Sequence, residues 1–407
     1  MVKIAVLGYG VVGSGIVQVL EQNRVHIEKQ ARRAVEVKYV LDTRDFSQEL
    51  GSKFTQNFNT ILKDEEVRIV AEVMGGLNPA YKYVKQALLR GKHVCTSNKE
   101  LVIKHGAELL AIAGERNLNF MFEASVGGGI PVVRPINLAL TTDKIVAVSG
   151  ILNGTSNYML TQMFNFNKSY AEALTQAQEL GYVEKDPTAD VGGFDACRKL
   201  AILMSLATGQ QVNYEDILTE GIEDIGPADF AFARAFGFSL KPMVDGRIST
   251  QGVSAVSAPM LVHHQHPISA VTGVFNSVFV QAEATGNVMF YGQGAGQLPT
   301  AGAVLTDIVD IAKHLNRHII YSWSAEKAAV LPASGYVTRK LIRISYDKNT
   351  GNLEKINRLN KAFVKRIPDY PSHAAWITPR ETEAATQAAL EGINVERILR
   401  VYEPMEV

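Results

Sequence analysis

The feature that most constrains this chain is a glycine-rich turn close to its first residue. Gly8, Gly10 and Gly13 form a GxGxxG pattern directly after the apolar run Lys3–Leu7 and ahead of a helix-forming segment. In such a turn the first glycine permits a tight bend, the second lets backbone approach a pyrophosphate, and the third lets helix and strand pack closely. The helix N-terminus adds N–H donors and partial positive charge for phosphates. The predicted nucleotide-site residues are Gly8, Tyr9, Gly10, Val12 and Gly13.

Short apolar runs alternate with amphipathic, helix-forming segments through the first third of the chain. The strand candidates are Lys3–Leu7, Val35–Leu41, Ile69–Met74, His93–Thr96 and Asn119–Glu123. Strands separated by helices indicate βαβ units and a parallel sheet with right-handed crossovers. We therefore predict an α/β protein whose N-terminal domain, residues 1–130, is a Rossmann-type doubly wound parallel sheet. We expect residues from about 296 to 332 to complete this domain, because a helix-like segment follows the turn Gly292–Gly296.

The pattern changes in the middle of the chain. Ile145–Leu152 is typical of a strand, helices are expected at 170–180 and 194–208, and Asp245–Val288 is rich in strand-forming residues. This composition predicts an α+β domain over residues 131–295, which we expect to bind the substrate and to form a dimer interface.

The residues after the second predicted strand bear on the choice between NAD and NADP. Asp42 could accept hydrogen bonds from the ribose hydroxyls of NAD, whereas Arg44 could pair with the 2′-phosphate of NADP. Both could instead face solvent in a surface loop. The prediction is NADP or NAD, with Arg44 tilting it slightly toward NADP.

Charge and cysteine content exclude several classes of protein. Among 407 residues, Lys plus Arg and Asp plus Glu both number 41, so no net field favours nucleic acid or an anionic membrane. No apolar run is long enough to span a bilayer, and no cleavage site follows the first strand, so we expect no signal peptide. Two cysteines are too few for a disulfide framework or a metal cluster. We expect a cytoplasmic metabolic protein.

Six further motifs resemble those of the homoserine dehydrogenase family, in the family's order and across nearly the whole chain. They are Thr96–Lys99, Phe122–Pro131, Gly150–Tyr158, Gly181–Pro187, Asp190–Leu200, and Gly294–Gly296 followed by Pro299-Thr300. The resemblance implies reversible hydride transfer between NAD(P)H and L-aspartate 4-semialdehyde, giving L-homoserine, in threonine, methionine and isoleucine biosynthesis. It also implies a homodimer or homotetramer.

Two lysines are the predicted catalytic residues. Lys99 follows a predicted strand, and the carboxyl end of a parallel strand is where open α/β sheets bind ligands. Lys199 lies four residues after Asp195, so the two share a helix face, although a surface ion pair of little energetic value would look the same. The resemblance implies that Lys199 is the proton donor and that Lys99 is a second essential lysine, which also contacts the cofactor.

The substrate contacts are also implied by the resemblance. Glu184 and Asp195 are expected to bind the amino acid end of the substrate, where carboxylates hold an ammonium in charge-assisted hydrogen bonds. Asp190 is a further acid of this group, and Gly181 is expected to contact the cofactor. On residue type alone, Glu184 could equally lie in a solvent-facing acidic loop.

A glycine-rich segment follows the fifth predicted strand. One carboxylate and a bent backbone offer the hard oxygen ligands that suit an alkali cation or calcium rather than zinc. The resemblance implies a sodium ion held at Glu123, Val126, Gly128 and Ile130. A bend that only joins two domains is compatible with the same residues. The segment His263–His266 contains three histidines close together in the sequence. No Cys or acidic residue accompanies them, so we do not assign them a metal.

The C-terminal residues 337–407 resemble a small ACT-like βαββαβ module. Strands are expected at Lys340–Tyr346, 364–367, 374–378 and 397–402, with helices at 353–363 and 382–391. The turn Asp347–Leu353 matches the place where ACT modules bind amino acids. The second strand is short and is interrupted by prolines, so either threonine control or a purely structural or dimer-forming tail fits.

Two alternatives belong to other functional classes. One is a catalytically silent regulator that binds a nucleotide and an amino acid on the same fold, and the other is a dehydrogenase of another small aldehyde. Intact Lys99, Glu184, Asp195 and Lys199 argue against the first. The paired motifs Gly150–Tyr158 and Gly181–Pro187 argue against the second.

Overall fold

The computed structural model describes residues 1–183, 186–345 and 364–405, and these form two compact units. Unit 1 consists of Met1–Lys144, Ala201–Asn213 and Phe290–Ala328. Unit 2 consists of Ile145–Leu200, Tyr214–Met289 and the chain from Ala329 onward. Each unit therefore gathers three separate stretches of the sequence.

Unit 1 contains a six-stranded parallel sheet with the strand order β3-β2-β1-β4-β5-β6. Its strands are β1 (Val2–Leu7), β2 (Val35–Leu41), β3 (Phe54–Thr55), β4 (Val67–Glu72), β5 (His93–Thr96) and β6 (Phe120–Met121). Its helices are α1 (Val11–Gln22), α2 (Arg24–Ala31), α3 (Ser47–Leu50), α4 (Phe58–Lys63), α5 (Ala80–Leu89), α6 (Lys99–Glu115) and α12 (Gln297–Lys313). The order reverses between β1 and β4, as in a doubly wound sheet that binds a dinucleotide at the reversal. The predicted Rossmann-type fold is confirmed.

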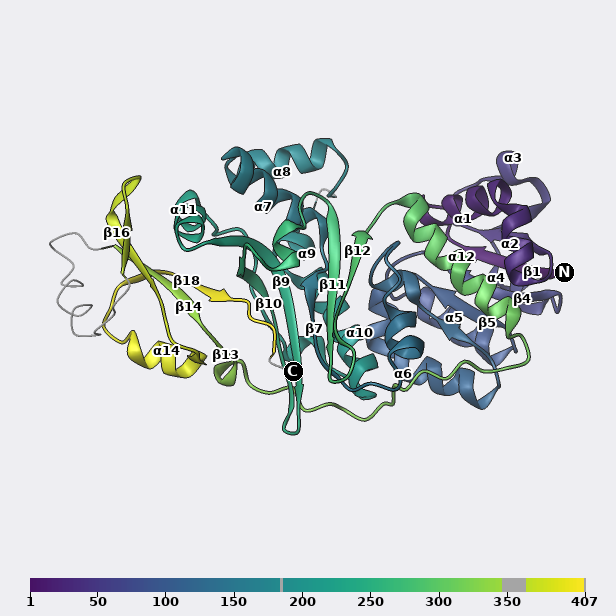
Figure 1. Ribbon diagram of the computed structural model, residues 1–407. Helices are drawn as coiled ribbons and strands as arrows, with labels where there is room; N and C mark the ends of the chain where they lie inside the picture. Colours follow the sequence, from purple (N-terminus) through teal and green to yellow (C-terminus); the bar gives the residue numbers. More distant parts are fainter. Residues whose placement is uncertain (184–185, 346–363, 406–407) are drawn as a thin grey trace. The chain divides into compact units, whose positions relative to one another are not determined.

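Helix α12 completes unit 1 although it comes almost 300 residues after β1 in the sequence. It packs along α1, and the two helices lie side by side in Figure 1, α1 in purple and α12 in green. Gly15 of α1 makes this contact close, because a Cβ there would lie 2.9 Å from Gln297 Cγ and 3.0 Å from Ala301 Cβ. Helices α1 and α12 pack against one face of the sheet. The β1 residues in this core are every second residue of the strand, as expected from the two-residue period of a β-strand.

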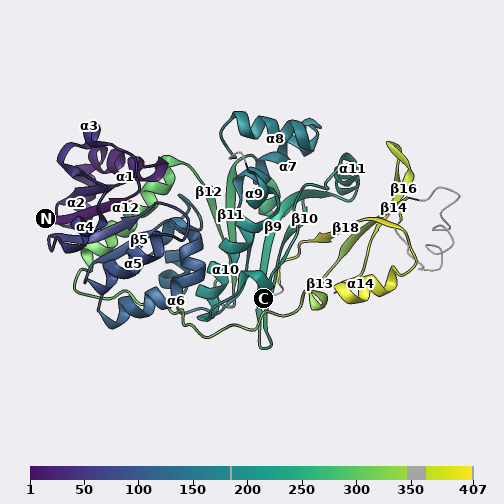
Figure 2. The same ribbon diagram turned by 180° about the vertical axis from the view of Figure 1, so that it is seen from behind.

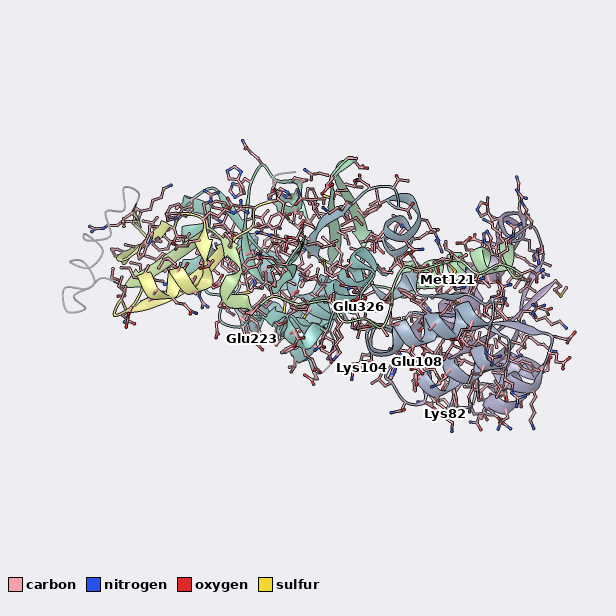
Figure 3. All side chains as sticks on the ribbon, turned by 90° about the horizontal axis from the view of Figure 1, so that it is seen from below. Lys82, Lys104, Glu108, Met121, Glu223 and Glu326 are labelled. Atoms are coloured by element: carbon pink, nitrogen blue, oxygen red, sulfur yellow. The ribbon has the colours of Figure 1, made fainter. Side chains whose placement is uncertain are left out.

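Helices α5 and α6 pack against each other, and α5 also contacts strands β4 and β5. Glu108 of α6, labelled in Figure 3, accepts hydrogen bonds from Tyr81 Oη and Lys85 Nζ of α5. Asn98 caps α6 by accepting a hydrogen bond from Leu101 N (3.1 Å), so the helix begins directly after β5.

Unit 2 is built around a mixed sheet with the strand order β12-β11-β7-β9-β10-β18-β14-β16-β15, and β8 pairs with β10 off this path. Its first strands are β7 (Ile145–Ile151), β8 (Leu218–Thr219), β9 (Phe238–Ser249), β10 (Gly252–His263), β11 (Phe275–Ala282) and β12 (Gly286–Gln293). Its helices before the tail are α7 (Gly154–Phe166), α8 (Tyr170–Glu179), α9 (Thr188–Val191), α10 (Phe194–Thr208) and α11 (Pro227–Ala235). The predicted helices at 170–180 and 194–208 are confirmed as α8 and α10. The last turns of α10 and the end of β12 belong to unit 1.

The C-terminal residues extend the sheet of unit 2. They form β13 (Val337–Thr338), β14 (Lys340–Ser345), β15 (Lys365–Ile367), β16 (Tyr370–Ile377), β17 (Glu381–Thr382), α14 (Glu383–Ala389) and β18 (Val395–Val401). Strand β18 pairs in parallel with β10 through Met260↔Arg400 and Leu261↔Val401, and it lies next to the end of β10 in Figure 2. The predicted turn Asp347–Leu353 and the helix expected at 353–363 lie outside the described residues.

Within the described ranges 1–183, 186–345 and 364–405, no helix is long and apolar enough to cross a membrane.

Candidate active site

The glycine turn between β1 and α1 has the geometry that its motif predicts. Gly8 has a φ of +99°, which disfavours any residue with a Cβ. A Cβ on Gly13 would lie 1.9 Å from the Gly8 carbonyl oxygen, so glycine is needed for close packing. At Gly10 an added Cβ would meet nothing within 4 Å, which leaves the backbone open on the side where a pyrophosphate could approach.

Asp42, just past the end of β2, holds this turn in place. Its Oδ2 accepts a hydrogen bond from Tyr9 N (2.7 Å), and its Oδ1 accepts one from Arg44 N (2.9 Å). The Arg44 guanidinium donates to both carboxylate oxygens, Nε to Oδ1 and Nη2 to Oδ2, each at 3.1 Å. Burial works to raise the pKa of Asp42, but the hydrogen bonds from Arg44 and Tyr9 outweigh it and bring this pKa to about 2. The carboxylate is therefore ionised and ordered.

The side chains of Tyr9 and Val12 pack inward rather than into solvent. Tyr9 is 9% exposed, lies edge-on to Phe46 at 4.9 Å, and donates from Oη to Glu49 Oε1 at 2.7 Å. Burial, followed by the bond to Glu49, raises the pKa of Tyr9 to about 12. Val12 packs against the same apolar core. These contacts fix the start of α1 beneath the turn.

Lys99 is the first residue of α6 and follows β5 at the carboxyl edge of the parallel sheet. Strand β4, the neighbour of β5 in the sheet, ends at Glu72. Glu72 is a buried acid that the sequence analysis missed. Glu72 accepts hydrogen bonds from Thr96 Oγ1 (2.6 Å) and Met74 N (2.8 Å). Burial raises the pKa of Glu72, and these bonds partly oppose it. The available signal was an acid directly after the apolar run Ile69–Ala71.

In unit 2, Lys199 and Asp195 form a buried ion pair on the first turns of α10. Lys199 Nζ lies 2.7 Å from Asp195 Oδ2, and their side chains are 12% and 8% exposed. Lys199 Nζ also donates to the Leu152 carbonyl at 2.9 Å, directly after β7. Two of the three ammonium N–H groups are thus used by these contacts. The surface ion pair considered from the sequence does not describe this environment.

Asn153 joins the two predicted acids of this cluster. Its amide nitrogen donates to Asp190 Oδ1 (2.7 Å) and to Asp195 Oδ2 (2.9 Å). Its Oδ1 accepts from Ser156 N at 2.8 Å and so caps α7. The sequence analysis did not single out Asn153, although an Asn directly before a helix-forming run is a recognisable N-cap. One amide therefore positions Asp190 and Asp195 together.

Gly181 lies just after the C-terminal end of α8 and has a left-handed backbone conformation, with a φ of +71°. A Cβ added to it would meet no atom within 4 Å. Its N–H donates to the Gln178 carbonyl, and Tyr182 N donates to the Ala177 carbonyl, which closes the helix. Glu184 lies outside the described residues.

Glu123 begins the glycine-rich segment of unit 1 and is 2% exposed. Its Oε1 accepts hydrogen bonds from Val132 N (2.6 Å) and Val133 N (2.9 Å), and its Oε2 accepts one from Arg134 N (2.8 Å). With two acceptor positions on each oxygen, Oε2 retains one after these bonds. The carboxylate therefore caps the N-terminus of the segment that begins at Val132, because it accepts hydrogen bonds from the first three backbone N–H groups of that segment.

A brace from α12 supports this segment. Asp307, which is fully buried, accepts from Glu123 N at 3.0 Å through Oδ2 and from Arg134 Nη2 at 2.7 Å through Oδ1. Arg134 Nε also lies 3.2 Å from Asp310. Burial raises the pKa of Asp307, while the neighbouring guanidinium opposes the rise. This buried network was not predicted.

Over most of its length, this chain is similar to known proteins. The family model described as "Homoserine dehydrogenase" matches residues 131–309, and the model "Homoserine dehydrogenase, NAD binding domain" matches residues 8–123. A homoserine dehydrogenase of Bacillus subtilis is 36% identical over 364 residues, covering 87% of this chain and 84% of that protein. One from Mycobacterium bovis is 43% identical over 323 residues, covering 77% and 73%. The crystal structure of a homoserine dehydrogenase from Thiobacillus denitrificans has a TM-score of 0.91 and 32% identity, covering 99% of this chain and 98% of that one.

This chain belongs to the homoserine dehydrogenase family. The family is one of oxidoreductases, and the matched NAD-binding region begins at Gly8 and ends at Glu123. The second matched region contains Asp190, Asp195 and Lys199. The C-terminal tail lies beyond both homoserine dehydrogenase models.

The histidine cluster has structural contacts within this homoserine dehydrogenase framework. His266 lies edge-on to Phe279 (5.0 Å) and Tyr402 (5.2 Å), and its Nδ1 accepts from Ile268 N. Among the described residues, no group of three or more His, Cys, Asp or Glu side chains could hold a metal ion.

Proposed function

We propose that this chain catalyses reversible hydride transfer between NAD(P)H and L-aspartate 4-semialdehyde, giving L-homoserine. The observation that carries the proposal is the Asp190–Asn153–Asp195–Lys199 network, which brings together one ammonium and two carboxylates from α9 and the start of α10. An aldehyde that accepts a hydride develops negative charge on its oxygen, and a cationic proton donor stabilises that charge.

Lys199 is the proposed proton donor. Its bonds to Asp195 and the Leu152 carbonyl fix the position of Nζ, and one N–H group is left by these two contacts to reach a substrate oxygen. Asp195 balances the lysine charge in a site with little solvent. Lys99 is proposed as the second essential lysine, and its place at the carboxyl edge of the sheet of unit 1 supports this role.

Glu184 and Asp195, with Asp190 beside them, are proposed to hold the substrate's α-ammonium group. An ammonium has three donors, and paired carboxylates satisfy them with charge-assisted bonds. For Asp190 and Asp195 the support is their shared amide partner, Asn153. For Glu184 the support is its place in the Gly181–Pro187 motif.

The cofactor is proposed to bind at the glycine turn, and its nicotinamide supplies or accepts the hydride. The turn residues Gly8, Tyr9, Gly10, Val12 and Gly13 would hold the pyrophosphate, and Gly181 would contact the cofactor elsewhere. Asp42 and Arg44 offer one acceptor group and one cation at the end of β2. We favour acceptance of NADP through Arg44, because its side chain is 62% exposed at the edge of the turn.

A sodium ion is proposed at Glu123, Val126, Gly128 and Ile130. The donor set fits such an ion, because Glu123 Oε2 retains an acceptor position. Among the described residues, no hydrogen bond is made to the carbonyl oxygens of Val126, Gly128 and Ile130. Oxygen ligands without nitrogen or sulfur suit a hard cation.

The tail is proposed to be an ACT-like module that has a structural role. Its strands have the order β18-β14-β16-β15, all antiparallel, as in a βαββαβ unit. Arg400 of β18 forms a two-pronged bond to Glu220 (2.7 and 2.9 Å), and Arg343 of β14 bonds to Asp229 of α11. The arginines of both pairs are buried, and the pairs link the tail to the rest of unit 2, which supports a structural role over a mobile sensor.

A cytoplasmic homodimer or homotetramer completes the proposal, with no nucleic acid or membrane as a partner. One assay tests the central claim: homoserine-dependent reduction of NAD and of NADP by the purified chain, each with and without threonine. We expect the chain to oxidise homoserine but not glycerol or 4-hydroxybutyrate. The reason is that the proposed acidic residues select a substrate with an ammonium group. Absence of homoserine turnover with both cofactors would overturn the proposal. Inhibition by threonine would overturn the structural role of the tail.

A further inference from the structure

Buried basic side chains in unit 2 divide into two kinds. Five Lys and Arg residues of its described part are at most 9% exposed, and four of them lie within 4 Å of a carboxylate. These four pairs are Arg247 with Asp245, Lys340 with Glu383, Arg343 with Asp229, and Arg400 with Glu220. The fifth is Lys241 on β9, which is 5% exposed and has no carboxylate within 4 Å among the described residues.

Lys241 has a carbonyl dipole for a partner rather than an opposite charge. Its Nζ donates to the Val271 carbonyl at 2.6 Å, just after the 3₁₀ turn Pro267–Ala270. A buried ammonium that lacks a counter-charge is costly, and one carbonyl compensates it incompletely. In agreement, burial lowers the pKa of Lys241 to about 8.

A cavity of about 50 Å³ lies beside Lys241. Its lining comes from α7, β9 and the segment after β10, and consists of Leu160, Thr161, Phe164, Asn165, Ser239, Leu240, Lys241, Ser269 and Thr272. None of these residues is acidic, so no lining group would repel an anion. On this measure one water needs roughly 10–15 Å³, so the cavity has room for a group of about three or four heavy atoms.

The polar groups of the lining differ in what they can offer. Thr161 Oγ1 donates its hydrogen to the Asn157 carbonyl, and Ser269 Oγ donates to the His264 carbonyl. Those hydroxyls are thereby committed as donors. Ser239, Asn165 and Thr272 make no side-chain hydrogen bond to another described residue, so they retain donors that can turn toward a ligand.

We propose that this cavity is a binding site for a small monovalent anion of the carboxylate class, such as acetate or bicarbonate. Lys241 Nζ supplies the single positive charge, which matches one negative charge. Ser239, with Asn165 and Thr272 at the rim, supplies neutral hydrogen bonds to a second oxygen. Binding completes the charge balance that the other four buried cations obtain from protein carboxylates. The site shares no lining residue with the Asp195–Lys199 cluster, so it is separate from the proposed catalytic centre.

The test is thermal unfolding of the full chain at pH 7 during titration with sodium acetate. Sodium gluconate at the same ionic strength is the parallel titration, because its anion is too large for the cavity. Acetate is expected to raise Tm by a saturable few degrees, and gluconate is not. Lys241→Met keeps the length of the side chain without its charge, and it should remove the saturable acetate response.

A matched control is Lys92→Met in unit 1. Lys92 is also buried and also bonds to carbonyls, those of Asp64 and Val67, but it does not line this cavity. Its variant should keep the acetate response of the wild type. If Lys241→Met does not fold, Ser239→Ala serves instead and should weaken the apparent Kd for acetate about fivefold.

Equal, non-saturating responses to acetate in the wild type, Lys241→Met and Ser239→Ala would overturn the proposal, because they would reflect general salt effects. A saturable response that persists in Lys241→Met would also overturn it, since the anion would then bind elsewhere. Bicarbonate in place of acetate should give the same pattern, because the two share a planar O–C–O group and one negative charge.

Discussion

Asp42 and Arg44 in unit 1 form one aspartate–cation pair, and Asp195 and Lys199 in unit 2 form another. In the first, the cation is 62% exposed and its carboxylate also holds a backbone N–H of the glycine turn. In the second, the side chains are 12% and 8% exposed, and the cation also holds a backbone carbonyl. The charges are alike, but solvent screens the first pair far more than the second.

This difference suits the two proposed tasks. A screened guanidinium at a rim can exchange its partner for a phosphate with little loss of free energy. A buried ammonium held at two points can keep one N–H aimed at a reacting oxygen, as preorganised catalysis requires. Substitutions should therefore have large effects on turnover at the buried pair and smaller, cofactor-selective effects at the exposed pair.

The largest expected effect is that of Lys199→Ala. We expect kcat for homoserine oxidation to fall by about 10²–10⁴, the range for loss of a general acid or base, because the proton-transferring group is removed. The Kd for the cofactor should hardly change. Steady-state kinetics and cofactor fluorescence titration measure both.

The control for this prediction is Arg24→Ala. Arg24 pairs with Glu28 at the same four-residue spacing, but its side chain is 61% exposed. It should leave kcat near the wild-type value. Near-normal turnover in Lys199→Ala would show that the buried pair is structural and would remove the contrast with Asp42–Arg44.

Glu184→Gln should have the next largest effect, on substrate binding. The amide keeps the shape of the side chain and loses its charge, so one charge-assisted bond to the substrate ammonium is lost. This loss is worth about 2 kcal/mol and should raise the KM for homoserine about tenfold or more, with little change in cofactor Kd.

Glu179→Gln, an exposed position on α8, is the matched control and should change neither constant. A fall in cofactor affinity with unchanged homoserine KM would assign Glu184 to the nucleotide site. No change in either constant would make the Gly181–Pro187 loop an exposed turn.

Arg44→Ala tests the exposed pair. If Arg44 exchanges its bond with Asp42 for one with the 2′-phosphate, the KM for NADP should rise about tenfold while the KM for NAD changes little. Arg33→Ala, an exposed arginine before β2, should affect neither. Equal effects of Arg44→Ala on both cofactors would mean that Arg44 only stabilises the loop around Asp42.

The two pairs also show how far sequence can predict a site. The glycine turn and the helices α8 and α10 depend on residues within a few positions of one another, so their patterns are visible in the sequence. The four-residue spacing of Asp195 and Lys199 was visible too, but their burial was not, because it depends on Leu152 and Asn153 more than 40 residues earlier.

Long-range ionic contacts were beyond sequence reasoning. Arg134 meets Asp307 across 173 residues, and Arg400 meets Glu220 across 180. The cavity beside Lys241 likewise joins three separate segments. A charged residue in a sequence does not reveal whether a partner will reach it after folding, and most charged residues are exposed. Strand β3 was missed for a different reason, since two residues are too few to show a period.

The smallest expected effect concerns the stability of the exposed pair in acid. The pKa of Asp42 in the folded chain is about 2, below its ordinary value of 3.8, so the folded state favours the ionised carboxylate. Its contribution is fully present above pH 4 and is lost as pH falls through about 2. Because Arg44 is well exposed, we expect this contribution to be about 1–2 kcal/mol.

Urea unfolding at pH 7, 4 and 3 measures this contribution. Asp42→Asn should have a lower free energy of unfolding than the wild type at pH 7, and this gap between the two should narrow below pH 4. Glu65→Gln, an exposed acid without such bonds, should show no gap at any pH. A gap for Asp42→Asn that stays constant down to pH 3 would mean that the loss of one of the two acceptor oxygens, rather than the loss of the charge shared with Arg44, destabilises the turn.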